Sequence, residues 1–80
     1  LHSLLMREAR ANRDWNLCTD IFLKLLHRHP EYSWVLRDAK SARAIAARCH
    51  REAQVRELLR YWARFHSDPE VRARAARAAD

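Results

Sequence analysis

The sequence predicts an all-α fold, a right-handed stack of antiparallel helical hairpins (an α-solenoid fragment) with about five helices. Apolar residues recur at helical spacings along the whole chain, without a run of β-branched residues. The 80 residues include no glycine and only two prolines, so the turn residues that a multi-stranded sheet needs are scarce. We therefore expect a single helical domain over residues 1–80. Because its first residues are already in helical register, we expect this domain to be an excerpt of a longer helical-repeat protein.

The segment 15–29 predicts the clearest helix, because both of its ends are marked. Asp14 can cap the free N–H groups of a first turn, and Pro30 cannot continue a helix. Between these ends, apolar residues fall at i, i+3, i+7 and i+10, which is the spacing of one helix face. Together with a flanking isoleucine, this face supplies the predicted core residues Trp15, Cys18, Ile21, Phe22 and Leu25.

A first helix is expected to run to about Ala11, with Leu5 in the core. The polar segment 12–14 that follows is short, and a connection of this length makes consecutive helices lie antiparallel. Residues 1–30 are therefore predicted to form a helical hairpin.

A second hairpin is expected over residues 35–66. Small and apolar residues, Ile45 among them, line one side of a predicted helix from about Asp38 to Arg51. A joint at residues 50–53 separates it from a helix whose broad apolar side carries the core candidates Leu58, Leu59 and Trp62.

The start of a further helix is expected over residues 68–80. Ser67 stands three residues before Glu70, as in a capping box, and Pro69 suits the first helical turn. This helix has little apolar bulk, so we expect it to pack against the second hairpin or to begin a third.

The hairpins repeat at roughly 38 residues, a period typical of helical solenoids. The first 34 residues resemble a tetratricopeptide or pentatricopeptide hairpin. A leucine of the first helix, a small residue early in the second, an aromatic residue one turn later and a terminal proline are matched by Leu5, Cys18, Phe22 and Pro30. Residues 35–69 keep the helix–turn–helix rhythm but carry Arg or Glu at several signature positions. The resemblance implies an α-solenoid.

Two shorter stretches resemble other helical families. Residues 68–78 are similar to the start of the inner helix of a HEAT repeat, which also implies an α-solenoid. Residues 57–62 resemble a helix of death-fold adaptors, which would imply a protein-interaction domain.

The composition predicts an anionic partner. Lys plus Arg is 16 against 10 for Asp plus Glu, a formal net charge of +6, and net charge governs association rather than fold. All basic residues except Lys24 and Lys40 are arginines, the side chain that suits bidentate phosphate contacts and stacking on bases. Between residues 33 and 66 eight basic residues face three acidic ones. A GC-rich genome would also enrich arginine without any functional demand.

Basic side chains are predicted to form two stripes on the second hairpin. Three arginines at i, i+4 and i+8 stand opposite the apolar side of its last helix, and a similar stripe lies on the helix before it. The aromatic joint between the hairpins can stack bases. The candidate nucleic-acid-binding residues are Arg37, Lys40, Arg48, Arg51, Arg56, Arg60, Arg64, Tyr32 and Trp34. The alternative is an ordinary solvated face.

We expect a non-catalytic binding module rather than an enzyme. The spacing of Ser, His and Asp places no nucleophile beside a base. Cys18 and Cys49 lack metal-ligand spacing, and His27 and His29 face different directions on one helix. We therefore expect neither a metal nor a cofactor.

RNA or a ribonucleoprotein assembly, bound through the arginine-rich surface, is the expected partner. The alternative is a protein–protein interaction scaffold that binds an anionic protein surface, and the death-fold-like adaptor is a third possibility. The stacked hairpins are expected to pack against further repeats or other subunits. The two cysteines, read as unpaired, indicate a reducing intracellular compartment, either cytoplasm or organelle matrix. The chain has no run of about 18 apolar residues, so the sequence predicts no membrane-spanning helix.

Overall fold

The computed structural model describes residues 2–80, with side-chain burial described from Met6 onward. The described residues form six helices and no strand: α1 (His2–Ala11), α2 (Trp15–Arg28), α3 (Ser33–Arg37), α4 (Ala39–Ala47), α5 (Glu52–Phe65) and α6 (Pro69–Ala79). The all-α prediction is therefore confirmed, with one short helix more than the expected five. The predicted core position of Leu5 lies outside the described side chains.

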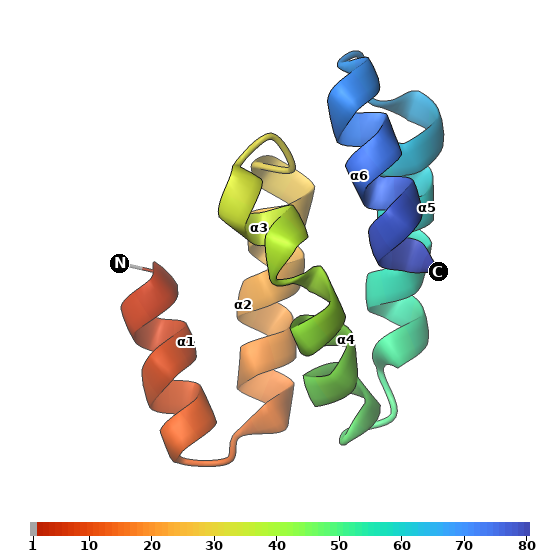
Figure 1. Ribbon diagram of the computed structural model, residues 1–80. Helices are drawn as coiled ribbons and strands as arrows, with labels where there is room; N and C mark the ends of the chain where they lie inside the picture. The colour runs from red at the N-terminus through yellow and green to blue at the C-terminus, as the bar shows by residue number, and fades with distance from the viewer. Residues whose placement is uncertain (1) are drawn as a thin grey trace.

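The helices lie side by side in chain order, from α1 at one side of the molecule to α5 and α6 at the other (Figure 1). Helix α2 contacts α1, α3, α4 and α5, and α6 packs mainly on α5 while also contacting α3 and α4. Helix α1, in contrast, contacts α2 alone among the described helices. This one-sided packing of α1 leaves space beside it, over the middle of α2.

The turn between α1 and α2 is a Schellman turn without glycine. Arg13 has a left-handed backbone with a φ of 56°. Its N–H donates to the carbonyl of Arg10 (3.1 Å), and the N–H of Asp14 donates to the carbonyl of Ala9 (2.8 Å), the two bonds that define this helix ending. The Asp14 carboxylate accepts a hydrogen bond from the N–H of Leu17 (3.1 Å), so Asp14 both closes α1 and caps α2.

The turn between α4 and α5 repeats this geometry. His50 has a φ of 60° and donates its N–H to the carbonyl of Ala47 (3.3 Å), while the N–H of Arg51 donates to the carbonyl of Ala46 (2.8 Å). Glycine is the residue most often found at the left-handed position, but the chain has none. The two hairpins therefore share one turn geometry, built at corresponding positions.

The predicted helix from about Asp38 to Arg51 starts as expected, with Asp38 as the N-cap of α4, but it ends earlier and follows a short helix that was not predicted. The aromatic joint before it is helical, because Val35 and Leu36 are buried and winding residues 33–37 into α3 turns both toward the core. Asp38, with φ −92° and ψ 4°, separates α3 from α4. Helix α4 ends at Ala47 rather than at Arg51, because the Schellman turn occupies the following residues.

The start of α6 also differs from the prediction by one residue. Asp68, not Ser67, is the N-cap, and its carboxylate accepts a hydrogen bond from the N–H of Glu70 (2.9 Å). Pro69 occupies the first helical turn as expected. The Arg72 side chain donates to the carbonyl of His66 (2.6 Å) and so fixes the approach of the chain to α6.

The other end of α6 is held by Arg43 of α4. Its guanidinium donates to the carbonyls of Ala78 (2.8 Å) and Asp80 (3.0 Å), which lie where the last carbonyls of a helix have no intrahelical partner. The Arg43 side chain is only 17% exposed and also faces Glu52 of α5 at 3.6 Å. This contact joins α4, α5 and α6, and thereby positions the exposed side of α6.

One hydrophobic core runs from α2 to α6. The predicted core residues Cys18, Ile21, Phe22, Leu25 and Leu59 are buried. Four other predicted core residues are only partly buried: Trp15, Ile45, Leu58 and Trp62. Small residues let α4 and α6 come close to their neighbours, and those that are buried include Ala39, Ala42, Ala46, Ala75, Ala78 and Ala79.

Candidate functional site

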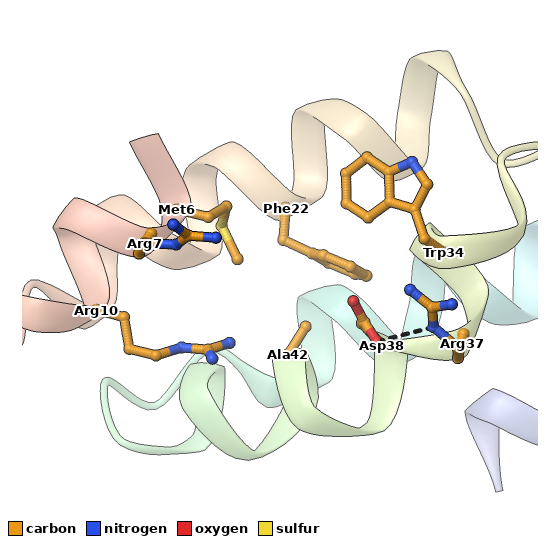
Figure 2. Close-up of a pocket in the computed structure, with 8 residues that line it drawn as sticks. All are labelled: Met6, Arg7, Arg10, Phe22, Trp34, Arg37, Asp38 and Ala42. Atoms are coloured by element: carbon orange, nitrogen blue, oxygen red, sulfur yellow. Dashed lines mark hydrogen bonds and ion pairs between the residues drawn. The ribbon is translucent and has the colours of Figure 1, made fainter. Parts of the chain in front are cut away.

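Two cavities flank the α3–α4 segment. The first has a volume of about 590 Å³ and is lined by Met6, Arg7, Arg10, Phe22, Trp34, Arg37, Asp38 and Ala42 (Figure 2). The second has a volume of about 420 Å³ and is lined by Ser33, Leu36, Arg37, Lys40, Arg74, Arg77 and Ala78. Both volumes fall in the range of roughly 300–1,000 Å³ that is common for ligand sites. Arg37 lines both cavities, so they adjoin at this residue.

The first cavity follows from the packing of α1. Helix α1 lies against α2 but makes no close backbone contact with α3 or α4. The space between them is bordered on the α1 side by Met6, Arg7 and Arg10, and on the other side by Trp34 and the start of α4. Phe22 of α2 is 2% exposed and lines the cavity between these two sides. Side chains from four helices, α1 to α4, thus line one cavity.

Basic side chains from four helices surround the two cavities. Helices α1 and α6 each contribute two arginines spaced three residues apart, a spacing that places both on one helix face. Helices α3 and α4 contribute one basic residue each. We call this surface the basic face: Arg7, Arg10, Arg37, Lys40, Arg74 and Arg77.

Most of the basic face is not neutralised by carboxylates. Arg37 faces Asp38 at 3.4 Å, but the two side chains are 72% and 55% exposed, and such surface pairs contribute only about 0–1 kcal/mol. Arg74 pairs with Glu70 at 2.8 Å, also at the surface. The remaining members form no ion pair with any described side chain: Arg7, Arg10, Lys40 and Arg77. The basic face can therefore bind an external anion without breaking a buried salt bridge.

Three of the predicted nucleic-acid-binding residues belong to this site. Arg37 and Lys40 lie on the basic face, and Trp34 lines the first cavity. The other predicted aromatic, Tyr32, does not line either cavity. It is 44% exposed and stacks on the ring of His29, with centroids 4.6 Å apart.

Arg51, a predicted phosphate contact, makes several contacts within the fold. Its guanidinium lies 2.7 Å from the carboxylate of Asp20 and donates to the Asn16 carbonyl (3.3 Å) and to the Gln54 side chain (2.7 Å). These bonds connect the turn before α5 to the first turns of α2. The donors of Arg51 are therefore already used within the fold.

Arg48 and Arg56 are also separate from the basic face. The Arg48 guanidinium lies 4.8 Å from the centre of the Trp15 ring, a cation–π contact that covers part of this tryptophan. Arg56 pairs with Glu52 one turn earlier on α5, at 3.5 Å. The basic stripe predicted before α5 is thus divided. Arg37 and Lys40 belong to the basic face, whereas Arg48 and Arg51 lie in the turn between α4 and α5.

Arg60 and Arg64 line a third cavity, of about 600 Å³, between α5 and α6. The same cavity is lined by Tyr61 and Phe65, whose side chains are exposed despite their size, at 50% and 65%. Of the three arginines predicted to form a ridge on α5, Arg56 does not line this cavity and pairs with Glu52 instead. Arg60 and Arg64 lie beside the exposed aromatic side chains of α5.

The sequence contained a signal for the residues that the prediction missed. Arg7 and Arg10, like Arg74 and Arg77, are arginine pairs at i, i+3 on short helices. Their proximity to Arg37 depends on how α1 and α6 pack beside α3 and α4. Spacing within a helix does not determine this arrangement.

No group of three or more His, Cys, Asp or Glu residues is placed to hold a metal ion within the described part of the chain. Burial raises the pKa of the Cys18 thiol, so this cysteine is held in its protonated, less nucleophilic form. In residues 2–80 we find no helix with the length and apolar character needed to cross a membrane.

Comparisons with known proteins give no family for the chain. No family model matches it, and neither a curated protein nor a solved structure is significantly similar to it. Function must therefore be argued from the site itself.

Proposed function

We propose that the protein is a non-catalytic helical-repeat module that binds RNA through the basic face. The observation that carries this proposal is the grouping of six basic side chains, from four helices, around two adjoining cavities. Four of the six form no ion pair with a described residue. A repeating phosphate backbone is the partner that matches several cations arranged along a surface.

The kind of cation also supports a phosphate ligand. Five of the six residues of the basic face are arginines, whose planar guanidinium can donate two parallel hydrogen bonds to a phosphate. Their exposure means that binding would displace water and counterions rather than buried partners. Affinity should then fall steeply with added salt, by a slope of about 0.7 for each neutralised phosphate of a single strand.

The repeat architecture belongs to the same proposal. Two hairpins, α1–α2 and α4–α5, are each closed by a Schellman turn with a left-handed residue, Arg13 and His50 respectively. Helix α6 follows as the first helix of a further unit. Helical repeats bind extended partners on a surface made by corresponding helices of successive units, and the basic face is contributed by α1, α3–α4 and α6.

Charge reversal on the basic face should weaken RNA binding without unfolding the protein. We expect Arg37→Glu with Lys40→Glu to reduce the affinity for a short single-stranded RNA by more than about tenfold at low salt, and to lower the salt slope by about 0.7 for each phosphate that is no longer bound. Fluorescence anisotropy titrations at two salt concentrations measure both quantities. Far-UV circular dichroism checks that the helices are retained.

The matched control is Arg60→Glu with Arg64→Glu. It changes the net charge by the same amount, but both residues lie on the third cavity, away from the basic face. This control should lose affinity much less than the Arg37 and Lys40 variant. Equal losses in the two variants would show that only net charge matters, and the basic face would then not be the binding site.

A protein-interaction scaffold is the second candidate function, favoured by one observation. Tyr61 and Phe65 are exposed side by side on α5, with ring centroids 5.1 Å apart. Exposed aromatic residues of this size are typical of protein interfaces. Under this alternative, Phe65→Ala would abolish partner binding, whereas the Arg37 and Lys40 variant would leave it intact.

A further inference from the structure

We infer that the first cavity receives one unstacked nucleobase of a single-stranded RNA, with the adjoining phosphates held by Arg7, Arg10 and Arg37. This inference rests on the proposed function and adds to it a preference for single strands. It concerns the cavity between α1 and α3–α4, not the whole basic face.

The inner surface of this cavity is apolar and aromatic. Trp34 is partly exposed and packs against the core, and Met6 faces it from α1. Phe22 lies between them at 2% exposure, so it supports the floor rather than offering a free ring. Figure 2 shows the indole of Trp34 at one end of the cavity, beyond the Phe22 ring. An indole face is a surface on which any base can stack.

The rim of the cavity is cationic on both sides. Figure 2 shows the side chains of Arg7 and Arg10 extending from α1 toward the hollow, while Arg37 stands beside Trp34 on the opposite side. If a base stacks on the Trp34 indole, the phosphates that flank it would therefore lie near guanidinium groups on both sides of the cavity. Arg7 and Arg10 have no carboxylate partner among the described residues.

Asp38 distinguishes this ligand from a simple anion. Its carboxylate lines the same cavity, and a carboxylate accepts hydrogen bonds but does not donate them. A bare phosphate or a polyglutamate peptide would pair with the arginines but would offer no hydrogen-bond donor to this carboxylate from its anionic groups. A base combines an apolar ring for Trp34 with N–H groups for Asp38, and its backbone supplies the phosphates for the arginines.

Duplex RNA should be a poor ligand for the same reason. A base that is paired and stacked in an A-form helix has both faces covered, and sequence-specific or stacking contacts in RNA complexes are made mainly with unpaired bases. The cavity is a recess between helices rather than a flat surface, so only a base turned out of a stack can enter.

The test compares RNA with and without bases. The probes are a ten-nucleotide single-stranded RNA and an oligomer of equal length and charge whose residues are abasic ribose phosphates. We expect the protein to bind the RNA about tenfold more tightly than the abasic oligomer. Trp34→Leu should remove this preference while leaving abasic binding unchanged, and Trp34→Phe, which keeps an aromatic ring, should retain most of it.

A spectroscopic readout separates stacking from a purely structural role of Trp34. Stacking of a base on an indole quenches its fluorescence, so RNA should quench the Trp15→Phe variant but not the Trp34→Phe variant. The abasic oligomer should quench neither.

Three outcomes would overturn the inference, and they can be told apart. Equal affinity for RNA and abasic oligomer, or quenching that persists in Trp34→Phe, would remove the base site but leave the basic face as an RNA-binding surface. Displacement of RNA by a polyglutamate peptide of equal charge, at equal concentration, would indicate an acidic protein partner instead. Absence of binding by both oligomers at low salt would overturn the proposed function itself.

Discussion

Replacing Phe22 with alanine is expected to lower the free energy of unfolding by about 3–5 kcal/mol. Phe22 is 2% exposed and belongs to the core that joins α2 to the later helices. Its removal would delete a large apolar side chain and leave a cavity next to the existing hollow under α1. A domain of this size has only about 3–5 kcal/mol of stability from its core. The variant should therefore be largely unfolded at 25 °C, as urea titration followed by circular dichroism would show.

Leu17→Ala is the matched control for this prediction. Leu17 lies on the same helix but is 44% exposed, so its truncation should change stability by no more than about 0.5 kcal/mol. Similar losses in Leu17→Ala and Phe22→Ala would mean that the buried face of α2 is assigned incorrectly.

Replacing Trp62 with alanine is expected to cost on the order of 3 kcal/mol, for a different physical reason. The indole N–H donates to the carbonyl of Leu26 at 2.8 Å. In a continuing helix that carbonyl would accept from the residue four positions later, but this residue is Pro30, which has no N–H. Leu26 is completely buried, so without Trp62 its carbonyl would have neither water nor a backbone donor.

Trp62→Phe separates the hydrogen bond from the packing. Phenylalanine keeps an aromatic ring against α2 but cannot donate, so we expect a loss of about 1–3 kcal/mol from the unsatisfied carbonyl. Tyr61→Ala, one position away and half exposed, should cost much less than Trp62→Ala. Thermal unfolding of the three variants measures the difference. A Trp62→Phe protein as stable as the wild type would contradict the role assigned to this hydrogen bond.

The sequence predicted α2 well because local signals and packing agree there. Asp14 caps the helix, the chain leaves it just before Pro30, and Cys18, Phe22 and Leu25 are buried on one face. Trp15 fits the same spacing but lies at the first turn, where it is only partly buried and Arg48 lies 4.8 Å from the centre of its ring. Periodicity identifies a face, but it does not say how far along the helix that face is covered.

The interruption at Asp38 was not predictable from periodicity. The apolar run that forms α3 has only five residues, too few to show a helical period, so the sequence predicts a joint there. No glycine or proline lies next to Asp38, so no local signal in the sequence separates α3 from α4. Tertiary packing of Val35 and Leu36 determines this geometry, as burial often overrides local propensity.

The candidate site was predicted only in part, because it is made by tertiary contacts. Arg37, Lys40 and Trp34 lie around the two adjoining cavities, whereas the arginines of α5 that the prediction groups with them lie elsewhere. Ion pairing was the second unseen factor, since the pair between Arg51 and Asp20 joins residues far apart in sequence. A count of charges alone treats such an arginine as free to bind an anionic ligand.

Nuclear magnetic resonance can locate the RNA-binding surface residue by residue. A ¹⁵N-labelled protein would be titrated with a short single-stranded RNA at low salt, and amide chemical-shift changes recorded for each residue. If RNA binds the basic face, the changes will concentrate in residues 6–10, 34–42 and 74–78, with the α5 segment 60–65 little affected. Changes centred on residues 60–65, or none at saturating RNA, would contradict binding at the basic face.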